Sequence, residues 1–416
     1  MICKVEIDRK LLPANGPQTA IVKVTLDAPP PPEKIKRPAV NLSIVLDRSG
    51  SMSGQKLEKA KDAAIGALRR LGPRDIFSLV VYDHNVNTII PAQLARNTEW
   101  IESQIKRIYS GGNTALFGGV SQGAAEVRKN LNGNYVHRII LLSDGLANVG
   151  PSSPDDLGRL GSALIKESIS VSTIGVGMDY NEDLMTRLSQ NSDGNSYFVE
   201  SERDLPRIFS SELGDVLSVV AKKVQLFIEC PKGVRPIRII GREGRIKGKV
   251  VELYLNQLYG SQEKYALIEV EITSGKTGEK RDIASARCLY ENPYTQQSEV
   301  STGRVFAGFT KDKAMVRKSV NPKVYKDYYM NTNALSQEKA ISLSDKGKKA
   351  EAVQELKQSA TKLREAGEAL NDADLLKQAE ETEVQADQIE KEGMTKKYRK
   401  KLRTDSYQMK NQQMSE

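Results

Sequence analysis

The spacing at which apolar residues recur differs from one region of the 416-residue chain to the next. Between residues 38 and 221, near-continuous apolar runs alternate with amphipathic segments that are long enough for helices. The runs lie at residues 41–47, 75–83, 87–94, 137–144, 169–177 and 196–201. Strands that are apolar on both faces and separated by helices are typical of a mostly parallel sheet covered on both sides. We therefore predict an α/β domain at residues 38–221, with a doubly wound, mostly parallel, six-stranded sheet.

Alternation with a period of two replaces this pattern on either side of the α/β region. Residues 1–37 contain two alternating stretches separated by a turn rich in Pro and Gly, and residues 222–310 contain several more. Such alternation indicates strands with one buried face. A lone hairpin is not stable in water, and residues 222–310 offer few strands to close a sandwich. We therefore predict that the N-terminal hairpin completes a β-sandwich with residues 222–310 and that the α/β domain is inserted between them.

The C-terminal quarter of the chain is rich in helix-forming residues. Ala and Leu recur mainly at spacings of three and four between residues 334 and 363, and Gly347 and Asn371 mark turns. This pattern predicts a small helical bundle over residues 311–393. Residues 394–416 are polar and basic, so we expect a flexible tail. The basic run 396–403 follows an acid-rich segment and can pair with that face.

Composition and charge narrow the class of protein. The hydrophobic share of 39% and the charged share of 28% are those of a folded globular protein. No apolar run approaches the length of about 18 residues that a membrane span needs, and charges interrupt the first residues, so we expect a cytoplasmic protein. The net charge of +9 is spread along the chain apart from the run 396–403, which makes it weak evidence for nucleic-acid binding.

Cysteine and histidine are too sparse for a zinc site. Cys3, Cys230 and Cys288 lie far apart, which favours reduced structural thiols over a disulfide framework. His84 and His137 each adjoin a predicted strand, and we expect both at the surface. No spacing among these residues fits zinc ligation. Any metal should therefore be held by oxygen.

Oxygen-bearing side chains follow two of the predicted parallel strands. The first of these strands ends in the sequence DRSGS (47–51), and the strand at 137–144 ends in SDG (143–145). A third segment, GGNTALFGG (111–119), places Thr114 at the start of a predicted helix. The carboxyl ends of parallel strands form the edge at which open α/β sheets bind ligands. The three segments therefore indicate a binding site at this edge.

Together these three segments resemble the metal-binding loops of the von Willebrand factor A (VWA) family. The metal-ion-dependent adhesion site of that family combines D-x-S-x-S with a distant Thr and a distant Asp. The matching positions are Asp47, Ser49, Ser51, Thr114 and Asp144. The resemblance covers residues 38–221 and implies a Rossmann-like fold. The whole arrangement is similar to bacterial VWA proteins of the type related to calcium-activated chloride channel regulators and inter-α-trypsin inhibitor heavy chains.

The chemistry of these five side chains suits a hard divalent cation. Two carboxylates and three hydroxyls favour Mg²⁺, with Mn²⁺ or Ca²⁺ as alternatives. Mg²⁺ retains water readily and so leaves a position for an outside group, which by the family's pattern is an Asp or Glu of a protein partner. The same residue types also serve as turn and cap residues, but three loops that match together favour the metal.

The resemblance implies a protein-binding scaffold and no enzymatic activity. Intracellular bacterial relatives of this kind suggest AAA+ ATPases, or Ser/Thr kinases and phosphatases, as associated partners. The DxS segment lacks the second carboxylate of DxD phosphatases, and neither G-x-x-x-x-G-K-[ST] nor G-x-S-x-G occurs. The alternative is an RNA-binding VWA protein that uses the basic C-terminal segment, similar in principle to Ro-type particles. The chain has too few predicted helices for the RNA-binding ring of such particles, so nucleic acid is not the expected partner.

Overall fold

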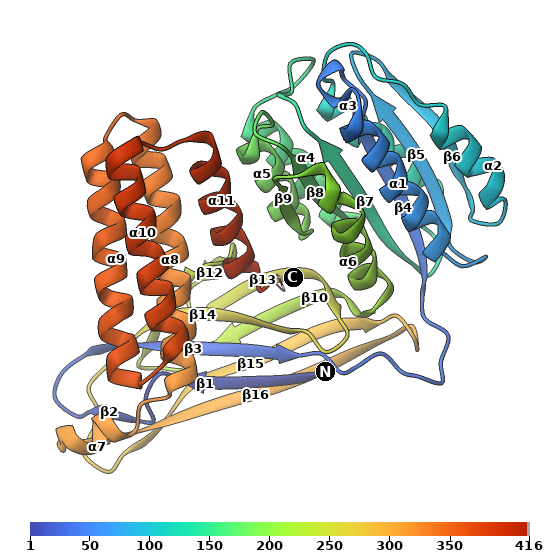
Figure 1. Ribbon diagram of the computed structural model, residues 1–416. Helices are drawn as coiled ribbons and strands as arrows, with labels where there is room; N and C mark the ends of the chain where they lie inside the picture. Colours follow the sequence, from blue (N-terminus) through green and yellow to red (C-terminus); the bar gives the residue numbers. More distant parts are fainter. Residues whose placement is uncertain (414–416) are drawn as a thin grey trace.

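The computed structural model describes residues 1–413 and shows three parts (Figure 1). Strands from both sides of an inserted α/β domain form a β-sandwich. The α/β domain and a C-terminal helical bundle stand on the same side of this sandwich (Figure 1). The predicted architecture, an α/β domain inserted in a sandwich and followed by helices, is confirmed.

The α/β domain is built on a six-stranded sheet in the order β6-β5-β4-β7-β8-β9. All neighbouring strands pair in parallel except β5 and β6, which are antiparallel. The strands are β4 (Ala39–Asp47), β5 (Ile76–Tyr82), β6 (Val86–Leu94), β7 (Tyr135–Ser143), β8 (Ile169–Val176) and β9 (Ser196–Val199). The chain crosses from β4 to β5 on one side and then to β7 on the other, so the carboxyl ends of β4 and β7 lie side by side.

Helices cover both faces of this sheet, as its two-sided apolar strands require. Along β4, Ile44 and Leu46 face one apolar cluster, whereas Val45 between them faces the other. The first cluster packs under α1 (Gln55–Arg70), α2 (Thr98–Lys106) and α6 (Leu205–Leu217). The second packs under α3 (Leu116–Arg128), α4 (Pro154–Lys166) and α5 (Glu182–Ser192).

The β-sandwich draws strands from both ends of the insertion. One sheet has the order β1-β3-β14-β11 and the other β12-β13-β10-β15-β16-β2. The predicted N-terminal hairpin forms from β1 and β3, and β3 also pairs with β14. The strands are β1 (Ile2–Ile7), β2 (Leu11–Pro13), β3 (Gln18–Asp27), β10 (Val219–Glu229), β11 (Val234–Ile240), β12 (Arg245–Lys247), β13 (Val250–Tyr259), β14 (Glu263–Ile272), β15 (Lys280–Asn292) and β16 (Gln297–Thr310). The boundary expected at residue 221 lies inside β10.

The C-terminal region is helical throughout its described length. The helices are α7 (Lys313–Lys318), α8 (Pro322–Asp345), α9 (Lys349–Leu370), α10 (Ala373–Glu392) and α11 (Lys396–Asn411). α8, α9 and α10 form an antiparallel bundle, and α8 packs on the sandwich through Val324, which contacts the cluster around Leu267. Buried Lys23 of β3 strengthens this contact, because its ammonium lies 2.5 Å from Asp327 of α8 and 3.1 Å from Glu263.

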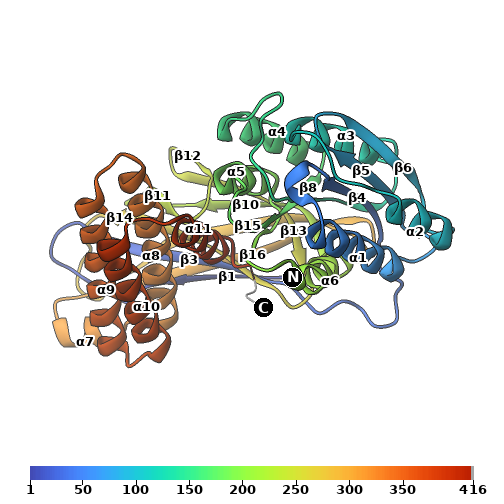
Figure 2. The ribbon, with the colours of Figure 1, turned by 45° about the horizontal axis from the view of Figure 1, so that its top comes forward.

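The expectation of a flexible basic tail from residue 394 is wrong. Residues 396–411 form α11, which runs between the bundle and α5 of the α/β domain (Figures 1 and 2). Thr395 caps its first turn, and Leu402 and Tyr407 are buried. The basic run pairs mainly with acidic residues of the α/β domain and not with the acid-rich face of α10. Local composition could not show this, because the partners are about 200 residues away in the chain.

Within residues 1–413, no helix combines the length and the apolarity that crossing a membrane would require.

Candidate metal site

The structure brings all five predicted site residues to one edge of the sheet. Asp47 is the last residue of β4, and Asp144 directly follows β7, the parallel neighbour of β4. Ser49 and Ser51 lie on the loop after β4, which contains the short 3₁₀ helix η1 (Gly50–Met52). Thr114 lies just before α3. Three loops thus meet where the sequence predicted a site.

The three hydroxyl groups converge on one point. The Oγ atoms of Ser49 and Ser51 are 3.1 Å apart, and Ser51 Oγ donates to Asp144 Oδ1 at 2.6 Å. A Cβ atom built on Gly145 would lie 3.2 Å from Thr114 Oγ1, 3.3 Å from Ser51 Oγ and 3.8 Å from Ser49 Oγ. Gly145 therefore leaves space that a side chain would fill, and oxygen atoms surround that space.

Asp47 forms the buried floor of the site. Its side chain is fully buried, accepts the Ser49 N–H at 2.8 Å and accepts the Ser143 hydroxyl at 2.7 Å. Burial raises the pKa of Asp47 to about 6, the two serine hydrogen bonds oppose this shift, and the Asp144 carboxylate adds to it. The charged form of Asp47 would gain from a nearby cation. Ser143, which orients this carboxylate, was quoted in the sequence motif but not recognised as part of the site.

Lys56 is a second residue that the sequence did not reveal. It lies in the first turn of α1, and its Nζ atom is 2.5 Å from Asp144 Oδ2 and 3.4 Å from the Ser51 carbonyl. Asp144 therefore uses one oxygen for Ser51 and the other for an ammonium group. No spacing rule distinguishes Lys56 from the other lysines of α1 in advance.

The loops are fixed to one another by backbone hydrogen bonds. Gly50 N–H donates to the Gly112 carbonyl, and Gly111 N–H donates to the Arg48 carbonyl. Gly112 has a φ of +75°, and a Cβ there would lie 2.2 Å from His84 Nδ1, so this position requires glycine. The arrangement of the hydroxyl groups is therefore set by rigid contacts.

The third loop is tied to the second through Asn148. The side-chain oxygen of Asn148 accepts the backbone N–H of Thr114 at 2.8 Å, and the backbone N–H of Asn148 donates to the Thr114 carbonyl. These two bonds fix the backbone that carries the Thr114 hydroxyl. Asn148 is a further site residue that the sequence motifs did not include.

The candidate metal site opens into a pocket of about 330 Å³, which we call the metal pocket. Residues of the three loops line it, among them the exposed Leu146, together with Asp179 from the loop after β8 and Lys396 from the start of α11. Lys396 Nζ and Asp179 Oδ1 are 3.0 Å apart. The C-terminal helical region thus contributes to the rim of the pocket, although its basic run was expected to lie in a tail.

The donor set fits a small divalent cation. Mg²⁺ binds oxygen at 2.0–2.1 Å in an octahedron, whose neighbouring oxygens are about 2.9 Å apart. The 3.1 Å separation of Ser49 Oγ and Ser51 Oγ is close to this value. In the described part of the chain no group of three or more His, Cys, Asp and Glu residues could hold a metal.

The two histidines play no part in this site. The surface position expected for His137 is wrong, because it lies in β7 with 6% exposure, next to Asn41, and burial lowers its pKa to about 4. His84 is exposed and lies beside Asp83. Among residues 1–413, neither histidine hydrogen-bonds to a serine of the loops. A Ser-His-Asp arrangement therefore has no support in the structure.

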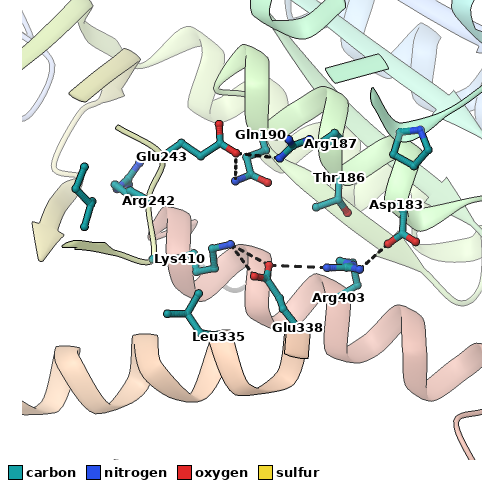
Figure 3. A pocket seen from close by; sticks show the side chains of 13 residues that line it. Asp183, Thr186, Arg187, Gln190, Arg242, Glu243, Leu335, Glu338, Arg403 and Lys410 are labelled. Atoms are coloured by element: carbon teal, nitrogen blue, oxygen red, sulfur yellow. Dashed lines mark hydrogen bonds and ion pairs between the residues drawn. The ribbon is translucent and has the colours of Figure 1, made fainter. Parts of the chain in front are cut away.

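A larger pocket of about 460 Å³ lies where α5, the loop after β11, α8 and α11 meet (Figure 3). We call it the junction pocket. Each carboxylate that lines it pairs with a Lys or Arg from another part of the chain. The pairs are Arg187 with Glu243 at 2.9 Å, Lys410 with Glu338 at 2.9 Å and Arg403 with Asp183 at 2.7 Å. These ion pairs join the parts of the chain. No residue that lines the junction pocket also lines the pocket at the candidate metal site.

Comparison with known proteins agrees with the fold of the α/β domain. Residues 41–211 match the von Willebrand factor type A domain. An uncharacterized protein of Synechocystis sp. is 28% identical over 275 residues, which are 64% of this chain and 64% of that protein. The inter-alpha-trypsin inhibitor heavy chain H2 of Mus musculus is 30% identical over 205 residues, which are 47% of this chain and 21% of that protein. The chain thus spans less than two thirds of the length of these relatives.

One solved structure resembles nearly the whole chain. A von Willebrand factor type A protein from Catenulispora acidiphila superimposes with a TM-score of 0.73 and 18% identity, covering 93% of this chain and 89% of that one. This similarity concerns the fold. The resemblance to VWA proteins and to inter-α-trypsin inhibitor heavy chains is therefore confirmed.

Proposed function

Because residues 41–211 form a von Willebrand factor type A domain, we propose that this chain is a divalent-cation-dependent protein-binding module and not an enzyme. VWA domains are metal-dependent interaction modules. The observation that carries the proposal is the convergence of three hydroxyl groups and two carboxylates from three loops at one sheet edge.

In this proposal Asp47, Ser49, Ser51, Thr114 and Asp144 hold Mg²⁺, either directly or through water. Only two of the protein ligands are carboxylates, and the other three are neutral hydroxyl groups. The ion therefore has few anionic ligands and can still bind a carboxylate from outside the chain. An Asp or Glu of a protein partner completes the coordination. Such a contact is strong and geometrically demanding.

The partner is a protein that exposes an acidic side chain. AAA+ ATPases, kinases and phosphatases are the partner classes that the sequence resemblance implies. The cytoplasm is the compartment we propose, and the three cysteines support it because all are buried and free.

Metal binding is tested first, without a partner. We expect the full chain to bind Mg²⁺ in isothermal titration calorimetry and Asp144→Ala to bind it at least tenfold more weakly. Asp155→Ala is the matched control, because Asp155 is an exposed carboxylate at the start of α4. Equal affinity of Asp144→Ala and Asp155→Ala, or no binding of Mg²⁺, Mn²⁺ or Ca²⁺ to the unmodified chain, would contradict the proposal.

The RNA-binding alternative is not supported by a specific observation. Five of the six cationic residues in the run 396–403 form ion pairs with acidic residues of the α/β domain. Arg399, Lys400 and Arg403 lie in pairs with side-chain exposures of 20% or less, so the run does not present a continuous basic surface for phosphates.

A further inference from the structure

We propose that α11 is part of the ligand-binding surface of the metal site, and that the ligand is an acidic protein segment with two carboxylates. One carboxylate completes the coordination of the metal, and Lys396 binds the other. This inference rests on the proposed function and adds the class of ligand and a specificity-determining residue. It starts from the position of Lys396 in the lining of the metal pocket.

Lys396 is available to a ligand. Its present partner is Asp179, and the side chains of Lys396 and Asp179 are 74% and 71% exposed. An ion pair with this exposure contributes little free energy, because water and salt screen it. A carboxylate of a bound partner can therefore replace Asp179 at small cost.

The helix that carries Lys396 is firmly held. One turn further along the same face, Lys400 has a side-chain exposure of only 3%, and its ammonium lies 2.5 Å from Glu182 and 2.6 Å from the Tyr180 carbonyl. Arg399 also pairs with Glu182. Lys396 is thus presented at a fixed place beside the metal loops.

Metal binding would reverse the charge balance around the pocket, where Asp47, Asp144 and Lys56 lie beside the lining residues Asp179 and Lys396. Without a metal, Asp47, Asp144 and Asp179 outnumber Lys56 and Lys396. A divalent cation neutralises Asp47 and Asp144, so the two lysines then outnumber Asp179. The loaded pocket therefore attracts anions, whereas the unloaded pocket repels them. A ligand with two carboxylates gains most from this reversal.

The apolar part of the pocket favours a protein segment over a free inorganic anion. Leu146 lines the pocket and is 58% exposed. A large exposed apolar side chain beside charged groups is typical of protein contact sites, where an apolar anchor is surrounded by polar contacts. A side chain next to the acidic residues of the ligand would cover Leu146.

The test uses synthetic peptides in fluorescence anisotropy with the full chain. One fluorescein-labelled Gly-Ser peptide carries a single Asp, and a set of matched peptides carries two Asp residues separated by zero to four glycines. With Mg²⁺ present, we expect at least one peptide with two Asp residues to bind about fivefold or more tightly than the single-Asp peptide. Chelation with EDTA should abolish this binding.

Three substitutions of lysines in α11 make the test specific. Lys396→Glu should remove the preference for two Asp residues, and Lys396→Gln should reduce it. Lys401→Glu is the matched control, because Lys401 is an exposed lysine of the same helix that lines a different pocket. Circular dichroism and Mg²⁺ titration of each variant establish that the fold and the metal site are intact.

The outcomes separate this inference from the proposed function. If Mg²⁺ does not bind to the unmodified chain, the proposed function fails and this inference fails with it. If Mg²⁺ binds but no peptide does, or if Lys396→Glu and Lys401→Glu keep the same preference, only the inference about α11 is overturned. Loss of the preference in Lys396→Glu alone supports it.

Discussion

The metal pocket and the junction pocket are both rich in charged side chains, but their charges are arranged in opposite ways. In the junction pocket, each carboxylate faces a Lys or Arg from another part of the chain, as Asp183 faces Arg403. At the candidate metal site, Asp47 accepts hydrogen bonds from the Ser49 N–H and the Ser143 hydroxyl and faces no Lys or Arg in an ion pair among residues 1–413, whereas Asp144 binds the Ser51 hydroxyl with one oxygen and the Lys56 ammonium with the other. Carboxylates paired with cations join structural parts, whereas carboxylates that are held by hydroxyl groups can accept a divalent cation.

Removal of one buried charge near the junction pocket should have the largest effect on stability. Glu182→Gln leaves the buried Lys400 ammonium without its carboxylate, so we expect the free energy of unfolding to fall by about 3 kcal/mol. Urea unfolding measures the loss, and amide exchange should show faster exchange in α11. Mg²⁺ affinity should stay within about twofold of that of the unmodified chain, because Glu182 does not line the metal pocket. A change in unfolding below 1 kcal/mol would mean that these charges do not hold α11.

The next largest effect should come from filling the space at Gly145. Gly145→Ala places a methyl group 3.2 Å from Thr114 Oγ1 and 3.3 Å from Ser51 Oγ, so we expect about a tenfold loss of Mg²⁺ affinity. Calorimetric titration measures it. Gly66→Ala in α1 is the control, since its Cβ would meet nothing within 4 Å, and there the affinity should not change. Unchanged affinity in Gly145→Ala would place the metal elsewhere.

A smaller effect, of opposite sign, is expected at Lys56. The ammonium of Lys56 competes with a metal for Asp144 and repels a cation bound nearby. Lys56→Met should therefore raise Mg²⁺ affinity by roughly threefold, and the gain should shrink at high salt. Titrations at two salt concentrations measure both effects. Lys59→Met, on the same helix and paired with exposed Asp62, should leave the affinity unchanged. A weaker affinity in Lys56→Met would show that Lys56 supports the site.

The smallest effect should appear at the exposed end of α11. Glu200 pairs with Lys397, and the two side chains are 56% and 53% exposed. We expect Glu200→Gln to change the free energy of unfolding by less than about 0.5 kcal/mol, because exposed ion pairs contribute little. Urea unfolding beside Glu182→Gln makes the comparison direct. A loss similar to that of Glu182→Gln would contradict the distinction between buried and exposed pairs.

The fold and the position of the site could be predicted because both depend on local patterns. Apolar runs such as 41–47 and 137–144 must become buried strands, and the polar residues directly after them then lie at one sheet edge. The insertion of the α/β domain also followed from local alternation, since the N-terminal hairpin could not be stable alone.

What the sequence did not reveal depends on contacts between distant segments. The basic run of α11 gives no local sign that its partners include Glu182 and Asp183. The burial of His137 results from its place in the central strand β7, where neighbours decide exposure. The contact between Lys56 and Asp144 joins residues that only the folded loops bring together.

The insertion of the α/β domain determines an order of events during synthesis. β3 (Gln18–Asp27) pairs with β14 (Glu263–Ile272), so the ribosome must produce more than 200 further residues before this edge finds its partner. The α/β domain, continuous from β4 to α6, can fold during that interval. A nascent chain can therefore hold a folded α/β domain behind a hairpin whose outer edge still lacks its partner strand, and an exposed strand edge of this kind favours aggregation during that interval.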